Sequence, residues 1–498
     1  MTIRSPHAAR RATRLASALL CLPLLLPPAR AIAPPIWPQP QPVPPTETTR
    51  PQFRAPSAAS CDRPVTARTV PGPGWRSQGA ATPLRSDAYA SGALAEAAKA
   101  RAESSDRRAA TDEARSAPMP TAPAAMLAPK LAQALPAPLA SSSRPRPPEP
   151  QQTQDSSVTA GVVDDNADFS EYLAFRKRTQ VEHRERDVRE RYLLEVKDAS
   201  GRGVPDAEVA VRSAAGAAMW ARTDTAGHAW LHPNAFDAGG RAGEYLVTAR
   251  SQGREATTTL RRGQKSAVEL RLDLGATAPR PAARLDLVFL VDATGSMGDE
   301  IDKLRASMQA MVREISALPS QPDLCLGLVA YRDRGDEFLI KAHDLSRDLP
   351  GFQHALDGLR ADGGGDEPEA MNEALADTVQ NISWRGDGAT RLVVLVADAP
   401  PHLDYGGVQY DESMMSALGK GIKIFSVGAS GLNKQGEYIQ RQIAQYTGGR
   451  FVFLTYADAR NPSSGPGRET VHDVKNYSVD TLDRLVVRLV SQELAALN

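Results

Sequence analysis

The pattern of hydrophobic and polar positions changes along the chain, and each pattern predicts a different kind of structure. Between residues 192 and 275, short runs alternate apolar and polar positions, and turn-forming residues such as Gly227 separate them. This period of two is typical of half-buried strands, and five or more such strands predict a small all-β sandwich. From residue 284 to residue 497, continuous apolar runs alternate with stretches of helical period. This alternation predicts an α/β fold with a doubly wound, mostly parallel sheet.

The apolar runs in this second region predict its strands and helices in turn. The predicted strands are residues 286–291, 324–331, 338–343, 391–397, 423–427 and 450–454. The predicted helices are residues 299–318, 351–359, 368–382, 412–420, 436–447 and 479–495. Because parallel strands require crossover connections, the carboxyl ends of the parallel strands should meet at one edge of the sheet.

The residues before the sandwich show neither pattern. Residues 1–31 contain several arginines, a short apolar core and a small-x-small ending, which is typical of an export signal. Residues 32–165 hold 23 of the 39 prolines, and we expect them to be disordered because they offer too little apolar surface to offset chain entropy. Residues 166–191 are charged and contain no Gly or Pro, which predicts an exposed, charged helix.

Composition limits the location and the partners of the protein. No run after the export signal approaches 18 consecutive apolar residues, so we expect no transmembrane span in the mature protein. The signal predicts export to a bacterial periplasm, to the cell envelope or to the medium. The 59 basic and 59 acidic residues balance, which argues against a nucleic-acid partner or an anionic membrane surface. The sequence does not indicate the oligomeric state.

Two cysteines, Cys61 and Cys325, follow the export signal. Cys61 lies in the Pro-rich region, whereas Cys325 lies in a predicted core strand. A bridge between them would join a disordered segment to a core, so we expect two free thiols and stability from packing alone.

A cluster of oxygen-bearing residues follows the first strand of the α/β region. The apolar run 287–291 ends at Asp292, and Thr294 and Ser296 follow at alternate positions. Open α/β sheets bind ligands in the loops that leave the carboxyl ends of their strands. One carboxylate and two hydroxyls favour a hard cation such as Mg²⁺, Mn²⁺ or Ca²⁺. The alternative is a strand-to-helix turn in which Thr294 or Ser296 caps the next helix.

The segment 292–296, Asp-Ala-Thr-Gly-Ser, resembles the DxSxS metal motif of the von Willebrand factor type A (vWA) family, with Thr in place of the first Ser. A Gly-rich loop at 363–366 and an acidic strand end at Asp398 follow in the family's order. Residues 331–337 and 429–432 are similar to a bacterial subgroup that also occurs beside α-kinase-type domains. The resemblance covers about residues 284–497 and implies the Rossmann-like vWA fold.

Two phrases of the sandwich region, at residues 196–209 and 222–231, resemble the transthyretin-like, carboxypeptidase-regulatory-type domains. This resemblance supports a β-sandwich and says little about function. We expect the domain to be a structural spacer or a docking module.

The vWA resemblance implies a role for each residue of the cluster. Thr294 and Ser296 should bind a divalent cation directly, most readily Mg²⁺. Asp292 and Asp398 should bind it directly or through water, and Asp366 stands where the family has a third-loop Thr. Three carboxylates around a dication give a formal local charge of about −1 by charge counting. Such a site should hold the metal more tightly but attract an acidic ligand less strongly.

Other polar residues near these loops have simpler interpretations. Glu367 and Glu369 should cap the helix that begins near Pro368, where a negative charge meets the positive end of the helix dipole. Asp333 could orient loop waters. His402 is a loop histidine, for which a general-base role is an alternative.

These observations favour a non-enzymatic, exported interaction module that binds a divalent cation and recognises a protein partner, with the metal as a bridge. No catalytic residue is assigned, because the HExxH, GxSxG and paired-Cys zinc patterns are absent from the sequence. Two alternatives are a metal-dependent hydrolase and an envelope component whose ion is purely structural.

Overall fold

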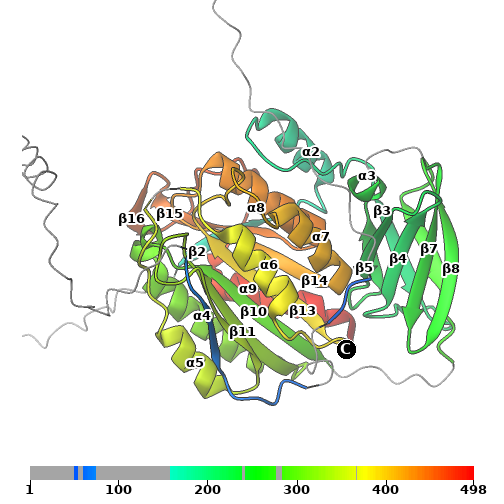
Figure 1. The fold of residues 1–498 in the computed structure, drawn as a ribbon, viewed down its shortest axis with the longest axis horizontal. Coiled ribbons are helices and arrows are strands. Elements are labelled where there is room, and N and C mark those ends of the chain that lie inside the picture. Colours follow the sequence, from blue (N-terminus) through cyan, green and yellow to red (C-terminus); the bar gives the residue numbers. More distant parts are fainter. Residues whose placement is uncertain are drawn as a thin grey trace, which may run out of the picture.

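The computed structural model describes residues 50–53, 60–73, 158–237, 242–275, 283–365 and 367–497. The predicted export signal, most of the Pro-rich region and Asp366 lie outside these residues. The described chain forms a large α/β head with a smaller β-sandwich beside it (Figure 1). The predicted fold class is therefore confirmed.

The head is built on a ten-stranded sheet whose centre is parallel. The central strands are β11 (Asp323–Tyr331), β10 (Arg284–Asp292), β13 (Thr390–Ala397), β14 (Ile422–Gly428) and β15 (Phe451–Asp458), in this spatial order. Strand β10 lies in the middle and is buried from its second residue to its last. Its continuous apolar run reflects this position, because helices cover both faces of the sheet.

Successive side chains of β10 point to opposite faces of the sheet. Leu287 and Phe289 pack with one set of helices, whereas Val288 and Leu290 pack with the other. The first set is α4 (Ile301–Ser316), α5 (Leu349–Asp357) and α9 (Leu482–Leu494), and the second is α6 (Met371–Asn381), α7 (Tyr410–Lys420) and α8 (Lys434–Thr447). The head thus has two apolar cores, one on each face of a doubly wound sheet.

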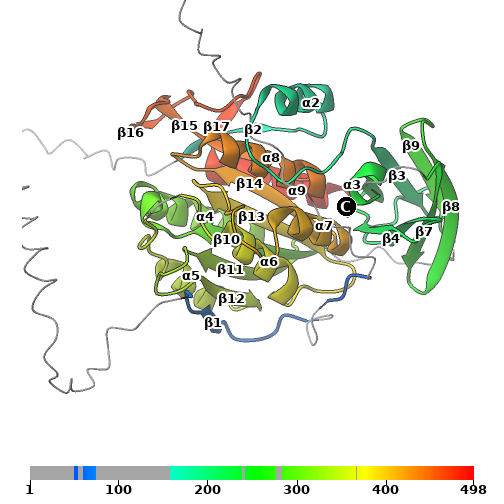
Figure 2. The ribbon, with the colours of Figure 1, turned by 45° about the horizontal axis from the view of Figure 1, so that its top comes forward.

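Antiparallel strands close both edges of this sheet, and two of them come from the region predicted to be disordered (Figure 2). These antiparallel strands are β12 (Ile340–Ser346) and β1 (Ala67–Val70) beside β11, and β2 (Thr159–Val163), β17 (Val479–Thr481) and β16 (Asn461–Pro466) around β15. The prediction of disorder was therefore wrong for β1 and β2. Both are short strands held by backbone hydrogen bonds to partners distant in sequence, so their own composition gives little sign of them.

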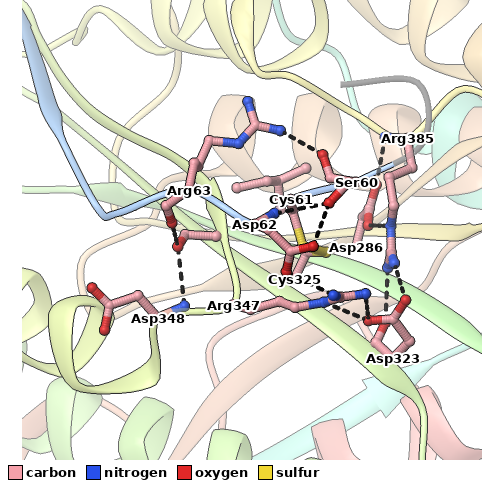
Figure 3. The surroundings of a disulfide bond; sticks show 12 residues. Ser60, Cys61, Asp62, Arg63, Asp286, Asp323, Cys325, Arg347, Asp348 and Arg385 are labelled. Atoms are coloured by element: carbon pink, nitrogen blue, oxygen red, sulfur yellow. Dashed lines mark hydrogen bonds and ion pairs between the residues drawn. A yellow bond between two sulfur atoms is a disulfide. The ribbon is translucent and has the colours of Figure 1, made fainter. Parts of the chain in front are cut away.

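A disulfide joins Cys61 to Cys325, so the expectation of two free thiols was wrong (Figure 3). The two Cα atoms lie 6.2 Å apart although 264 positions separate them in the sequence. They meet because residues 60–73 follow the sheet instead of leaving it, and both sulfurs are buried. Around the bridge, Arg347 pairs with Asp62 at 2.7 Å and with Asp323 at 2.6 Å, which further attaches the N-terminal segment to the head.

The sandwich consists of two small sheets, as the period of two predicts. One sheet has the order β6 (His228–Leu231), β3 (Tyr192–Lys197) and β9 (Ala267–Arg271). The other has the order β5 (Ala218–Arg222), β4 (Glu208–Ser213), β7 (Glu244–Ser251) and β8 (Arg254–Arg261), and the short helix α3 (Pro233–Phe236) follows β6. All neighbours are antiparallel except β3 and β9, which pair in parallel.

The segment 166–191, predicted as one exposed helix, is helical only at α2 (Phe169–Arg178). The aromatic rings of Tyr172 and Phe175 are buried against the head, and the chain beyond α2 continues without a second helix. Arg186 is also buried and contacts the Asp411 carboxylate of α7 at 2.8 Å. The prediction was wrong because these charges pair with the head instead of facing solvent.

The sandwich is an insertion in the head, since it lies between β2 and β10 in the sequence and packs against α7 through β5. Asp206 of the sandwich accepts hydrogen bonds from Arg222 at 2.6 Å and from Arg391 of β13 at 2.9 Å. The backbone N–H of Gly388 donates to the other Asp206 oxygen at 2.6 Å. These buried contacts fix the sandwich to the head. Among the described residues, no helix has the length and apolar character needed to span a membrane.

Candidate metal-binding site

The loop that leaves β10 brings three of the predicted site residues together. Asp292 Oδ1 accepts hydrogen bonds from the Thr294 backbone N–H at 3.0 Å and from Thr294 Oγ1 at 2.7 Å. The hydroxyls of Thr294 and Ser296 lie 3.1 Å apart. Thr294 precedes a short 3₁₀ helix, Gly295–Asp299, but its side chain makes no capping hydrogen bond. The capping alternative is therefore wrong for Thr294, whose hydroxyl points to the carboxylate.

Asp398 joins this group from the neighbouring strand. It directly follows β13, which pairs in parallel with β10, so both strands end at the same edge of the sheet. The Ser296 side chain lowers the pKa of the Asp398 carboxyl, so it favours the ionised form. Asp292, Thr294, Ser296 and Asp398 thus lie at the same edge of the sheet.

The two aspartates are buried and incompletely satisfied. Asp292 Oδ2 and Asp398 Oδ1 have no hydrogen-bond partner among the described residues. Burial raises the pKa of Asp292, and the charge of Asp398 raises it further. Burial likewise raises the pKa of Asp398, with smaller contributions from Glu367 and Glu300. Two such carboxylates repel each other, and a dication between their free oxygens would offset both the repulsion and the desolvation.

The Gly-rich loop is held against the β10 loop by backbone hydrogen bonds. Gly295 N–H donates to Gly363 O at 3.0 Å, and Asp362 N–H donates to Ala293 O at 3.0 Å. Gly363 and Gly364 have backbone φ values of +74° and +63°, which residues other than Gly rarely adopt.

A side chain in this loop would also collide with its neighbours. A Cβ at Gly363 would lie 2.5 Å from the Asp336 carboxyl, which accepts a hydrogen bond from Gly364 N–H at 2.8 Å. Asp366 follows this loop but lies outside the described residues, so its role at the site remains a prediction.

Glu369 was misread from the sequence as a helix cap. Helix α6 begins at Met371, its N-cap is Ala370, and no side chain caps it. Glu369 is instead 3% exposed, and its Oε2 has no partner among the residues described. A Cβ added to Gly364 would lie 2.9 Å from Glu369 Oε1 and 3.0 Å from Thr294 Cβ, so Glu369 borders the site.

The environment of Glu369 explains its unusual titration. Burial, together with the charges of Asp292, Asp333 and Asp398, raises its pKa to about 9. The sequence contains one sign of this burial, because Glu369 directly precedes the apolar residues Ala370 and Met371. Both of these side chains are buried in the structure. A carboxylate directly before buried apolar residues is better explained as part of a functional site than as a solvent-exposed helix cap.

The outer residues support the loops. Arg332 Nε donates to Ala293 O at 3.2 Å, while Arg334 pairs with Glu373 at 2.9 Å. His402 contacts Asp333 at 3.2 Å and Asp404 at 3.0 Å. His402 is therefore occupied by two carboxylates in a loop beside the site.

The chemistry of the donors fits a hard cation. Thr294 and Ser296 offer hydroxyls, and Asp292 and Asp398 offer carboxylate oxygens without partners. Within the described ranges, no group of three His, Cys, Asp or Glu side chains has a metal-binding arrangement. Hydroxyl and carboxylate oxygens are the ligands of Mg²⁺ sites, whereas zinc sites favour His and Cys.

Comparison with known proteins agrees with this fold. Residues 286–399 match the family model of the von Willebrand factor A domain, so the chain contains a vWA domain. It is 29% identical over 177 residues to the alpha-protein kinase vwkA of Dictyostelium discoideum, covering 33% of this chain and 27% of that protein. It is 28% identical over 192 residues to integrin beta-4 of Homo sapiens, covering 32% of this chain and 10% of that protein.

The chain thus spans only about a quarter or less of these relatives. Among solved structures, the pilus adhesin SpaC from Lactobacillus rhamnosus GG in its open conformation matches with a TM-score of 0.28 and 12% identity. That match covers 41% of this chain and 30% of the adhesin.

Proposed function

We propose that this protein is an exported, non-enzymatic interaction module whose vWA head binds a divalent cation, most readily Mg²⁺, and uses that site to recognise a protein partner. The proposed ligands are Asp292, Thr294, Ser296, Asp398 and, from the adjoining loop, Asp366. The observation that supports this proposal is the pair of buried carboxylate oxygens without partners at Asp292 and Asp398, beside two hydroxyls.

A bound cation would supply positive charge at the rim of the sheet. The residues around it would fix that charge: Asp292 orients the Thr294 hydroxyl, and the two backbone hydrogen bonds from the Gly-rich loop hold the loops together. Asp366, if it faces the ion, would neutralise part of the charge, so recognition would depend less on an acidic partner residue.

Two finer features belong to the same proposal. The sandwich is of the transthyretin-like, carboxypeptidase-regulatory type, and the head is of the bacterial vWA subgroup. Export agrees with the buried disulfide, since disulfides persist mainly in oxidising compartments.

Affinity capture from envelope extracts tests this proposal. The full chain should retain a protein in Mg²⁺ and release it with EDTA, and Asp292→Asn should not retain it. The matched control is Asp302→Asn, because the Asp302 side chain lies near the same edge but is 77% exposed. A partner that Asp292→Asn retains equally, or that EDTA does not release, would contradict metal-dependent recognition.

A further inference from the structure

Residues 60–73, here called the strap, run along one edge of the head and are fastened to it at two places. At one end, the disulfide joins Cys61 to Cys325 of β11. Farther along, β1 pairs with β12 over four residues (Figure 2). The pairing continues at Val70, whose carbonyl oxygen accepts a hydrogen bond from the Leu339 N–H at 2.9 Å. The strap therefore follows the sheet from the amino end of β11 toward the edge that holds the candidate metal site.

Beyond β1, the strap packs on the loop that leaves β11. Gly72 is buried, and a Cβ added to it would collide with the carbonyl oxygen of Asp336 and lie 3.2 Å from the Asp336 backbone nitrogen. Only a glycine allows two backbones to approach this closely. The contact between the strap and this loop is thus direct and leaves no room for a side chain.

Asp336 extends this contact to the metal site. Its Oδ2 accepts hydrogen bonds from the Asp333 N–H at 3.0 Å and from the Gly364 N–H at 2.8 Å. A Cβ at Gly364 would lie 3.0 Å from the Cβ of Thr294, one of the proposed ligands. An unbroken series of contacts therefore joins the strap to the ligands through Asp336 and the Gly-rich loop. Such contiguous contacts are the physical means by which distant sites can be coupled.

The disulfide is the strongest attachment of the strap. The strap also forms three ion pairs with the head: Asp62–Arg347, Arg63–Asp344 and Arg68–Asp377. Each pair has a partner that is at least 30% exposed, and such pairs contribute only about 0–1 kcal/mol. Val65 and Val70 are only partly buried against the two apolar cores. Segments with so few buried contacts open locally at low cost, so the covalent bridge keeps the strap in place.

We propose that the strap, fastened by the Cys61–Cys325 bridge, positions the Gly-rich loop of the metal site, with Asp336 as the positioning residue between them. Cys325 precedes Tyr331, the last residue of β11, by six positions. At ~3.3 Å per residue, the bridge therefore acts on the cation site from about 20 Å away along the strand. This inference rests on the proposed function, because it concerns the cation affinity of the same site.

Hydrogen exchange of the full chain in EDTA tests the positioning without any metal. Peptides that cover residues 360–365 contain the Gly364 amide, which donates to Asp336. We expect these peptides to exchange at least tenfold faster in the double variant Cys61→Ala/Cys325→Ala than in the wild type. Peptides of β15, on the other side of the sheet, should exchange equally in both proteins and show that the variant remains folded. If exchange at residues 360–365 is the same in both, the proposal is wrong.

A second variant keeps the disulfide and displaces only the end of the strap. Gly72→Ala places a Cβ against the Asp336 backbone and should also speed exchange at residues 360–365. The matched control is Thr69→Ala, because Thr69 lies on the strap with an exposed side chain. It should leave exchange at residues 360–365 unchanged, and equal acceleration by both variants would contradict a specific role for the contact with Asp336.

Mg²⁺ titration then measures the effect on the cation site. Both Gly72→Ala and the double cysteine variant should bind Mg²⁺ at least tenfold more weakly than the wild type. Asp206→Ala, which loosens the interface between sandwich and head, should retain the wild-type affinity, because lower stability alone does not move the Gly-rich loop. Equal affinities in the wild type and both strap variants would overturn the proposal. A wild-type chain that binds no Mg²⁺ contradicts the proposed function, whereas unchanged loop exchange contradicts only the role of the strap.

Discussion

The strongest energetic consequence of the site concerns Glu369 in the metal-free protein. Burial and the neighbouring aspartates raise its pKa from 4.5 to about 9. Its carboxyl group is therefore protonated in the folded protein at pH 7 but ionised in the unfolded chain. Because the folded-state pKa is the higher one, the contribution of Glu369 to stability is greatest below about pH 4.5 and declines as the pH rises toward 9. Between pH 5 and pH 7 this loss amounts to about 2–3 kcal/mol, since each pKa unit corresponds to ~1.4 kcal/mol.

Glu369→Gln should remove the part of this dependence that comes from Glu369, because glutamine is a neutral isostere of the protonated acid. The part that comes from Asp292 and Asp398, whose pKa values are also raised, should remain. Urea unfolding in EDTA at pH 5 and pH 7 measures it: the variant should match the wild type at pH 5 and be more stable by about 2–3 kcal/mol at pH 7. Glu337→Gln is the control, since that side chain is 69% exposed. If wild type and Glu369→Gln lose stability equally between these pH values, the described environment of Glu369 is incorrect.

Three further outcomes are expected. Asp206→Ala leaves the buried guanidiniums of Arg222 and Arg391 without their carboxylate. It should lower the free energy of unfolding by about 3–5 kcal/mol in urea denaturation. An effect under ~1 kcal/mol would contradict a fixed interface between sandwich and head. Cys61→Ala should cost about 2–5 kcal/mol in the same assay, and a reductant should then have no additional effect on the variant. Gly364→Ala places a Cβ 2.9 Å from Glu369 Oε1 at a backbone φ of +63°. It should weaken Mg²⁺ binding at least tenfold in calorimetry. The control Gly335→Ala, at a φ of +95° but with open space around the added Cβ, should leave Mg²⁺ binding unchanged.

The sequence predicted the head well because its signals are local. The buried run of β10 and the residues Asp292, Thr294 and Ser296 belong to one short segment, and Asp398 ends the next parallel strand. Parallel pairing then brings their loops to one edge, so no long-range information beyond the strand order is needed.

The errors concern contacts between segments that are distant in sequence. Strand β1 and Cys61 are ordered only because β12 and Cys325 lie beside them, and a Pro-rich composition does not show this. The sequence around Arg186 predicts a solvent-exposed charge, because it does not show that Asp411 of α7 lies beside Arg186 in the fold. Glu369 reads as a cap because its burial depends on the Gly-rich loop and on both aspartates.

The central claim is that oxygens of Asp292, Thr294, Ser296 and Asp398 share one hard cation. Isothermal titration of Mg²⁺ and Mn²⁺ into the EDTA-treated, dialysed full chain tests it most directly. We expect saturable binding of one ion per chain, lost in Asp292→Ala and in Asp398→Ala and retained in Asp302→Asn. Equal binding by the wild type and Asp292→Ala, or no binding by the wild type, would contradict the claim.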